Sequence, residues 1–267
     1  MCIRDRVKAE AWIVGAIVSP FVDFFRRHGW IALVILGFIA LYRISDLTMG
    51  IMANPFYVAL HYSKIDIANV TKLFGLVMTL VGAGFGGLVV ARCGIMRPLL
   101  AGAVLVGVTN LCFAWMASFL PTVPLQDMMA GTLYQDPSLS GVIGLAERMW
   151  TWPSPPLWPL TITISLDNFA GGFATSAFIA YLSSLTNTTY TATQYALFSS
   201  LMTLAGKFIS GWSGVVVEIA GFPVFFLYAA GTGIPAIVLV WFLMRRMNAD
   251  EIRRRDAAAL AAAEAGE

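Results

Sequence analysis

The sequence predicts an all-α integral membrane protein whose core is a bundle of six transmembrane helices. Hydrophobic residues make up 58% of the 267 residues and charged residues only 12%, about half the charged fraction of a soluble domain. The mean hydropathy is +0.77, and the charges are grouped so that long apolar runs remain between them. Neither a soluble globule nor a disordered chain could hide this much apolar surface. No run alternates with a period of two residues, which argues against a barrel of strands.

Six apolar runs are long enough to cross the roughly 30 Å hydrocarbon core, which takes about 20 helical residues. In chain order they are 30–59, 70–91, 98–119, 157–182, 195–219 and 223–244. The first run is long enough to tilt or break. Together the runs predict a membrane domain over residues 30–246.

Three further segments flank or interrupt this domain. Residues 1–29 are predicted to be an N-terminal cytoplasmic or interfacial linker, with an amphipathic stretch before the first span and an opening hexapeptide of uncertain origin. Residues 120–156 form a long outer loop, rich in Trp and Pro toward its end, that is expected to rest on the membrane surface or to act as a lid. Residues 247–267 are expected to form a solvated cytoplasmic tail.

The distribution of basic residues predicts the orientation, because cytoplasmic loops carry an excess of Lys and Arg. Both termini are predicted to be cytoplasmic, and the outer loop carries only Arg148. The turn at 187–193 is expected inside although it has no basic residue. Twelve of the 17 basic residues fall on the cytoplasmic side in this arrangement: Arg4, Arg6, Lys8, Arg26, Arg27, Arg92, Arg97, Arg245, Arg246, Arg253, Arg254 and Arg255.

Small residues recur along the second and fifth spans. Gly82 and Gly86, four residues apart, predict a face on which two helix backbones approach closely. Such faces serve close packing, and they also let packed helices slide or rock during transport; the two interpretations are compatible. The residues assigned to packing or gating are Gly82, Gly86, Gly87, Arg92, Gly94, Gly171, Gly172 and Gly211.

Five ionisable residues lie inside the predicted spans, where a central charge costs at least about 2.5–3.5 kcal/mol. Arg43 and Asp46 are three residues apart on one helix and can pair. Asp167 and Lys207 are predicted at a similar depth, so the four charges predict one polar site inside the bundle. Lys72 is nearer a span end and is expected to reach the interface.

Helix-breaking residues accompany these charges. Asn54 and Pro55 are expected to interrupt the first span, and Asn168 with Gly171 and Gly172 the fourth. Exposed backbone at membrane depth is tolerated only beside protein or a watery cavity. The site is therefore interpreted as a solute pathway, with purely structural ion pairs as the alternative. The residues assigned to the substrate or proton pathway are Arg43, Asp46, Asn54, Asp167, Asn168, Gln194 and Lys207.

The sequence lacks the usual motifs of soluble chemistry. It has no phosphate-binding Gly-rich loop, and neither His28 nor His61 has a second ligand at metal spacing. Cys2, Cys93 and Cys112 are scattered and suggest neither disulfides nor a metal site. The prediction is therefore no metal, no cofactor, no enzymatic activity and no nucleic-acid partner.

Four short segments carry a resemblance to a known family. The turn at 87–94 (GLVVARCG) looks like the glycine–basic loop that major facilitator transporters place between the second and third helices of each half. Segments 42–46 (YRISD), 167–172 (DNFAGG) and 190–197 (YTATQYAL) resemble the AmpG-type muropeptide permeases and, more distantly, the acetyl-CoA transporters. The likeness extends from about Pro20 to Arg246.

Three residues depart from the pattern of that family. Ala91 stands where the N-terminal copy of the loop usually has Asp, Asp167 where Glu is expected, and Lys207 where Arg is expected. The last two keep their charge, but Lys cannot form the bidentate fork of Arg.

The resemblance implies that the chain corresponds to the C-terminal half of a twelve-helix fold and that an N-terminal six-helix half is a missing partner. It also implies proton-driven uptake of muropeptide-like solutes across the inner membrane, by rocking of the two halves around a midplane site. Arg43 and Lys207 would attract substrate carboxylates, while Asp46 and Asp167 would hold these cations and exchange protons. Which carboxylate titrates stays open.

Two other functions remain open. The first is a six-helix membrane assembly or scaffold protein that acts alone or as a dimer. The second is an intramembrane hydrolase, for which the sequence offers serines and threonines at 183–193 but no accompanying His base.

Overall fold

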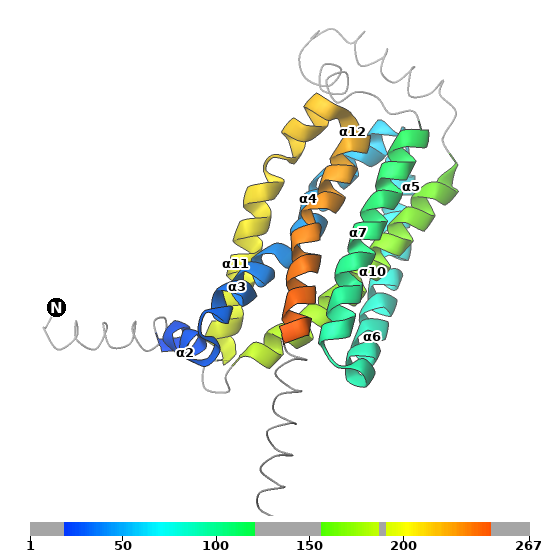
Figure 1. Cartoon of the computed structure of the whole chain (residues 1–267). Helices are drawn as coiled ribbons and strands as arrows, with labels where there is room; N and C mark the ends of the chain where they lie inside the picture. The colour runs from blue at the N-terminus through cyan, green and yellow to red at the C-terminus, as the bar shows by residue number, and fades with distance from the viewer. Residues whose placement is uncertain (1–18, 121–155, 187–190, 247–267) are drawn as a thin grey trace, which may run out of the picture.

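The computed structural model describes residues 19–120, 156–186 and 191–246, and the regular structure of these residues is entirely helical (Figure 1). The interior of the predicted outer loop and the tail at 247–267 lie outside the described residues. In chain order the helices are α2 (Ser19–His28), α3 (Ile31–Tyr42), α4 (Ile44–Ala59), α5 (Lys64–Asn69), the π-helix η2 (Val70–Gly75), α6 (Leu76–Cys93), α7 (Met96–Phe119), α10 (Leu157–Leu185), α11 (Thr191–Ser210) and α12 (Ser213–Thr232). Residues 234–246 continue as helix.

Four helical stretches of the described chain are long and apolar enough to cross a membrane, judged by length and composition. These are Ile31–Ala59, Lys64–Cys93, Met96–Phe119 and Ser213–Arg246. The helix α10, with 29 residues, is long enough to cross a membrane. Neither α10 nor α11 is among the four stretches, however. Both carry more polar residues than the others. The protein is thus a helical membrane bundle whose less apolar helices, α10 and α11, lie among more apolar ones.

The stretch Ser213–Arg246 reverses direction at Gly221, whose φ of 77° and ψ of 172° are not helical. The order of contacts along α4 demonstrates the reversal. A Cβ on Gly206 would meet Leu47, and one on Gly214 would meet Met52; after the turn, Phe222 packs on Phe56. Further on, the Ala229 carbonyl reaches back to Ser45. The chain therefore runs along α4 in one direction before Gly221 and in the other direction after it.

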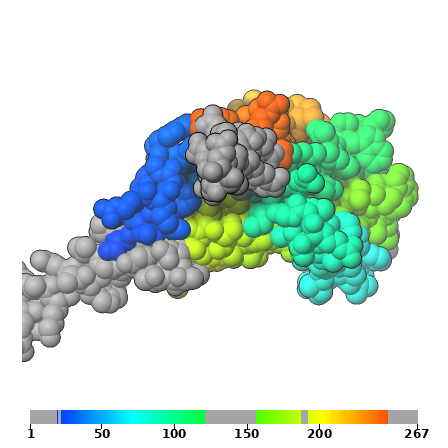
Figure 2. All heavy atoms as spheres, turned by 60° about the horizontal axis from the view of Figure 1, so that its bottom comes forward, coloured from blue at the N-terminus to red at the C-terminus, as the bar shows by residue number. Residues whose placement is uncertain are grey.

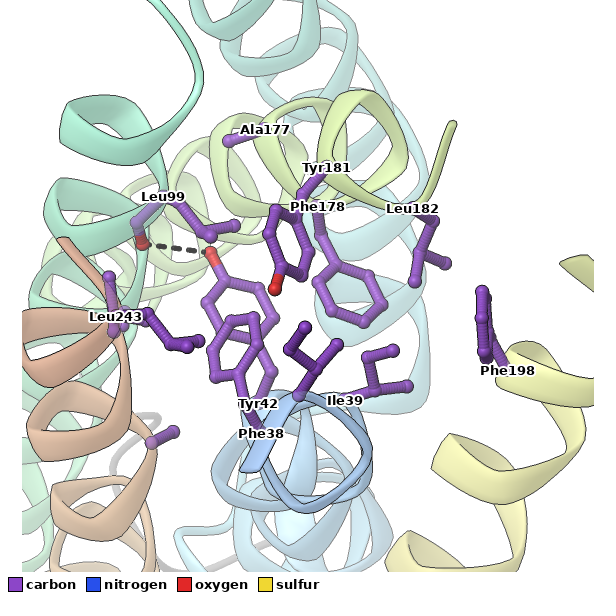
Figure 3. Close-up of a cluster of buried hydrophobic side chains, with 14 of the residues drawn as sticks. Phe38, Ile39, Tyr42, Leu99, Ala177, Phe178, Tyr181, Leu182, Phe198 and Leu243 are labelled. Atoms are coloured by element: carbon purple, nitrogen blue, oxygen red, sulfur yellow. Dashed lines mark hydrogen bonds between the residues drawn. The ribbon is translucent and has the colours of Figure 1, made fainter. Parts of the chain in front are cut away.

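The core consists of two hydrophobic clusters, one toward each end of the bundle. The first cluster surrounds Phe38, Tyr42, Phe178 and Tyr181 (Figure 3), with the Tyr42 and Phe178 rings stacked 4.7 Å apart at 9°. The second cluster surrounds Phe56, Phe113 and Phe226. The α7 residues of the first cluster are Leu99, Ala103 and Val106, and those of the second are Phe113, Ala114, Met116 and Ala117. The middle of α7 therefore belongs to neither cluster.

The helices α6 and α10 approach each other closely, through glycine. A Cβ on Gly82 would overlap the carbonyl oxygen of Phe169, and one on Gly172 would overlap that of Thr79. At Gly86 the carbonyl oxygen of Phe173 would lie 2.8 Å from an added Cβ. Because backbone carbonyls cannot move aside as a side chain can, only glycine fits at these three positions.

The predicted interruptions at Asn54–Pro55 and at Gly171–Gly172 are wrong. α4 continues through Pro55 to Ala59, and α10 is unbroken from Leu157 to Leu185. Proline within a membrane helix need not break it, because neighbouring groups bond to the backbone carbonyl that the proline leaves free. Gly172 does not break α10 either; its missing side chain allows α6 to come close. The first run instead breaks at Arg43, where φ is −101° and ψ is 6°. A second irregularity, the π-helix η2, lies where the sequence predicts nothing unusual.

Candidate functional site

A band of polar residues lies between the two hydrophobic clusters. We call it the central polar layer; it comprises Arg43, Ser45, Asp46, Thr48, Thr109, Asn110 and Asp167, from α7, α10 and the α3–α4 region. Its α7 members lie in the stretch that separates Val106 of the first cluster from Phe113 of the second. Four of its members (Ser45, Thr48, Thr109 and Asn110) are almost fully buried. Buried polar groups are stable only when they bond to each other, to backbone or to water.

Arg43 is the cation of this layer. Its position at the break between α3 and α4 directs one guanidinium nitrogen, Nη1, to the Thr175 hydroxyl at 3.0 Å. The other nitrogen, Nη2, forms an ion pair with the Asp46 carboxylate. About a quarter of each side chain stays exposed, 27% for Arg43 and 24% for Asp46. The pair is therefore partly open to a ligand.

A small cavity adjoins the Arg43–Asp46 pair. Its wall joins charged, aromatic and small residues from α3, α4, α7 and α10. The lining residues are Tyr42, Arg43, Asp46, Ala103, Val106, Gly171 and Ala174. An added Cβ on Gly171 would meet nothing within 4 Å, so this glycine leaves room on the cavity wall.

Asp167 is the second carboxylate of the layer. The Thr109 hydroxyl donates to its Oδ1 at 3.2 Å. Asp46 is near enough for the two negative charges to repel. No ion pair between Asp167 and a cation occurs among the described residues. The two carboxylates therefore differ: Asp46 faces an arginine, whereas Asp167 has a neutral donor.

Neutral side chains extend the layer from α7 to α4 and α12. The Asn110 amide donates to the Ser45 hydroxyl at 2.7 Å, and that hydroxyl donates to the Ala229 carbonyl at 2.7 Å. Two further oxygens, Asn110 Oδ1 and Thr48 Oγ1, are buried and have no hydrogen-bond partner among the described residues. Three helices are thus joined by one polar chain with spare acceptors.

Lys207 and Asn54 lie apart from this layer. Both are exposed, and no ion pair joins Lys207 to Asp46 or Asp167 in the described part of the chain. Lys207 shares its face of α11 with exposed Leu204 and Phe208. The sequence placed all four charges in one site, and the structure brings together only Arg43, Asp46 and Asp167.

Asn168 and Gln194 also point elsewhere. Asn168 faces α6, where its Oδ1 accepts from the Thr79 hydroxyl at 3.0 Å. Gln194, only 1% exposed, lies at the start of α11 and contacts α2: its amide donates to Asp23, and its oxygen accepts from Arg27, both at 3.4 Å. Gln194 therefore anchors α2 and does not reach the central polar layer.

The remaining glycines and Arg92 mark turns and open faces. Gly94, with φ of 77°, ends α6, and Arg92 is exposed two residues earlier. Gly211 lies in the turn between α11 and α12. Gly87 is exposed, and a Cβ added to it would lie 4.0 Å from its nearest neighbour, the Ser176 hydroxyl.

Sequence reasoning missed the neutral partners Thr109, Thr175, Ser45 and Asn110. Threonine and serine occur throughout membrane helices, where they often bond to their own backbone, so their presence alone is uninformative. One signal was available: Thr109–Asn110 is a polar pair in the middle of the third apolar run. In the described residues no group of three or more His, Cys, Asp and Glu side chains is arranged to hold a metal.

Comparison with known proteins gives a consistent set of relatives. No protein-family model matches the chain. It is 29% identical over 248 residues to the transporter AmpG 4 of Rickettsia felis, covering 92% of the chain and 51% of that protein. It is 26% identical over 238 residues to the anhydromuropeptide permease of Escherichia coli, covering 88% and 41%. It is also 30% identical over 225 residues to an uncharacterized protein of Haemophilus influenzae, covering 84% and 47%.

The chain spans about half the length of the curated relatives it matches. Those with functional names are transporters or a permease and not enzymes. The resemblance carried by the four motif segments is thereby confirmed: the chain is a multi-pass membrane protein homologous to the AmpG-type transporters.

Proposed function

We propose that the chain forms one six-helix half of a proton-coupled transporter that moves muropeptide-like anionic solutes across the inner membrane. The observation that carries the proposal is the partly exposed Arg43–Asp46 pair beside a cavity in the central polar layer. An ionisable residue inside a membrane segment is by default a functional site. The name of the Escherichia coli relative, anhydromuropeptide permease, supplies the substrate class.

The helix geometry supports a division into six crossings. They are α3–α4, α5–α6, α7, α10, α11 with the first part of α12, and the part of α12 after Gly221 with residues 234–246. In this arrangement α2, the α6–α7 turn and the end of 234–246 lie at the same end of the molecule, the end that is turned forward in Figure 2. Arg26, Arg92, Arg97, Arg245 and Arg246 lie there, so we assign this end to the cytoplasm. The membrane domain then spans 30–246.

Arg43 is the proposed ligand for a substrate carboxylate. Its guanidinium is planar and has five N–H donors, of which the Thr175 and Asp46 contacts use only some. An incoming carboxylate can therefore take over from Asp46 on the same fork. Lys207, on an exposed face of α11, is proposed to act at a different point of the pathway. Asn54, on the exposed side of α4, is proposed to line its mouth.

Asp167 is the proposed proton-exchanging carboxylate. Asp46 has a permanent cation beside it, whereas Asp167 has the Thr109 hydroxyl and the repulsion of Asp46. Protonating Asp167 breaks no ion pair among the described residues, whereas protonating Asp46 would break its pair with Arg43. Substrate arriving at Arg43 frees Asp46 and raises the negative charge near Asp167, which couples substrate binding to proton uptake.

A second six-helix half is proposed as partner, because the relatives are about twice as long as the matched region. Alternating access in this class of transporter rocks two halves around a midplane site. The α6–α10 glycine contacts are proposed to keep this half rigid during that motion, because helices that pack backbone against backbone cannot shift without steric overlap.

Vesicle counterflow of labelled anhydromuropeptide tests the function. Vesicles contain either the chain alone or the chain produced with the segment encoded immediately upstream. Exchange of the labelled solute is expected in vesicles that contain the chain together with the upstream segment. The Arg43→Ala variant is expected to lose this exchange. Uptake that survives both Arg43→Ala and Asp46→Asn would show that the site is wrong. A solute-binding dimer of the chain alone would show instead that no second half is needed.

A further inference from the structure

Two arginines at the end of the last described helix have aromatic neighbours. The Arg245 guanidinium lies 3.8 Å from the centroid of the Trp241 ring. The Arg246 guanidinium lies 5.8 Å from the centroid of the Trp30 ring and 5.6 Å from that of the Phe242 ring. The Arg246–Trp30 contact brings the start of α3 beside the end of 234–246, so the group is built from two segments far apart in the sequence.

Neither arginine has an acidic partner within the described chain, where the ion pairs are Arg27–Asp23 and Arg43–Asp46. Both side chains are exposed. A guanidinium that rests on an aromatic face still has its N–H donors free along its edge. Arg245 and Arg246 are consecutive residues, and the free edge of a guanidinium suits a phosphate group, which arginine binds through paired hydrogen bonds.

A row of exposed apolar side chains on the last described helix ends at Arg245. Ile234, Val238, Trp241 and Arg245 follow one another at spacings of four, three and four residues and therefore share one face of the helix. The first three are 58%, 54% and 43% exposed. At the start of α3, Trp30, which precedes the helix, and Leu33 are 60% and 63% exposed. A soluble anion would use only the arginines, whereas this arrangement offers apolar surface of acyl-chain type directly beside them.

We propose that Arg245 and Arg246, with Trp30 and Trp241, form a binding site for one anionic glycerophospholipid. The phosphate binds the two guanidinium edges, and an acyl chain lies along Ile234 and Val238. Tryptophan at this level is typical of the membrane interface, and basic pockets between membrane helices bind anionic headgroups. The site is independent of the transport pathway, because it lies at one end of the bundle and shares no residue with the central polar layer.

Native mass spectrometry of the full chain in detergent tests the proposal, with phosphatidylglycerol, phosphatidylcholine and inorganic phosphate as probes. Phosphatidylglycerol is expected to be retained in preference to phosphatidylcholine. Its affinity is expected to fall about fivefold for each arginine removed in Arg245→Gln and Arg246→Gln. The matched control, Arg92→Gln with Arg97→Gln, removes the same charge at the α6–α7 turn and should leave the affinity unchanged.

Two more variants separate a fixed site from general attraction. Arg245→Lys and Arg246→Lys keep the charge but lose the planar fork, so the affinity for phosphatidylglycerol is expected to fall part of the way. Val238→Asn should weaken phosphatidylglycerol binding, and inorganic phosphate should still fail to displace the lipid. If the double glutamine variant does not fold, the single Arg245→Gln variant, altered only at an exposed side chain, gives the same comparison.

Three results would overturn the site. The first is equal retention of phosphatidylglycerol and phosphatidylcholine, and the second is an equal loss of affinity in the Arg92 and Arg97 control. The third is displacement of the lipid by millimolar inorganic phosphate, which would identify a site for soluble anions.

Discussion

The Asp167 carboxylate accepts a hydrogen bond from the Thr109 hydroxyl, with 3.2 Å between the two oxygens. The other carboxylate of the central polar layer, Asp46, faces Arg43. This difference in partners leads to different expectations for the two aspartates, although both are acids at similar depth.

Asp167→Asn is expected to uncouple transport from the proton gradient. The amide keeps the size of the carboxyl group and can still accept from Thr109, but it cannot take up a proton. Counterflow exchange should persist, and accumulation driven by an imposed pH gradient should disappear. Thr109→Val, which removes the donor and keeps the charge, serves as control and should retain coupled uptake. Gradient-driven accumulation by Asp167→Asn would exclude this residue as the proton carrier.

Arg43→Lys is expected to reduce substrate affinity without abolishing exchange. A lysine keeps the positive charge, but one ammonium cannot reproduce the separate contacts of Nη1 with Thr175 and Nη2 with Asp46. A hydrogen bond to a charged group is worth about 1.5–3 kcal/mol, which corresponds to a loss of roughly 10- to 150-fold. Concentration-dependent counterflow measures it. Thr175→Val should show a smaller loss in the same assay, and wild-type affinity in Arg43→Lys would contradict the proposed role of the fork.

Gly172→Ala is expected to lower the thermal stability of the bundle. Its new Cβ would overlap the Thr79 carbonyl oxygen, so α6 and α10 must separate, at a cost of about 1–3 kcal/mol. Gly84→Ala is the matched control, because nothing lies within 4 Å of a Cβ there. Alanine at that position should be neutral or stabilising by up to about 1 kcal/mol. Unfolding in detergent followed by circular dichroism compares the two, and equal melting temperatures would contradict the close approach.

Phe24→Ala is expected to release α2 from the bundle. Phe24 is 2% exposed, and its ring lies 5.1 Å from that of Phe198 on α11. Truncating a buried Phe costs about 3–5 kcal/mol, which exceeds what the long contacts of Gln194 with Asp23 and Arg27 can supply. Hydrogen exchange across Ser19–His28 should rise. Val22→Ala, at an exposed neighbour on the same helix, should leave exchange unchanged; an equal rise in both variants would point to general loosening.

Much of the architecture could be predicted from the sequence, because membrane helices are governed by local composition. The apolar runs at 98–119 and 157–182 agree with α7 and α10 within three residues at each end. The break in the long first run was predicted, but at Pro55 instead of Arg43. A proline removes one backbone donor, and whether the helix then bends depends on neighbours that the local sequence does not contain.

Composition and local sequence pattern predict that this protein lies in a membrane, that its helices are apolar, and that a few charges lie within them. Which of these charges contact each other depends on how the helices pack. Residue spacing along one helix predicts the Arg43–Asp46 pair, since three residues complete most of a turn. It cannot predict that Asp167 takes Thr109 from α7 while Lys207 lies on an exposed face, because depth in the membrane does not specify the rotation of a helix about its axis. That rotation is set by packing, here by contacts such as Gly172 against Thr79.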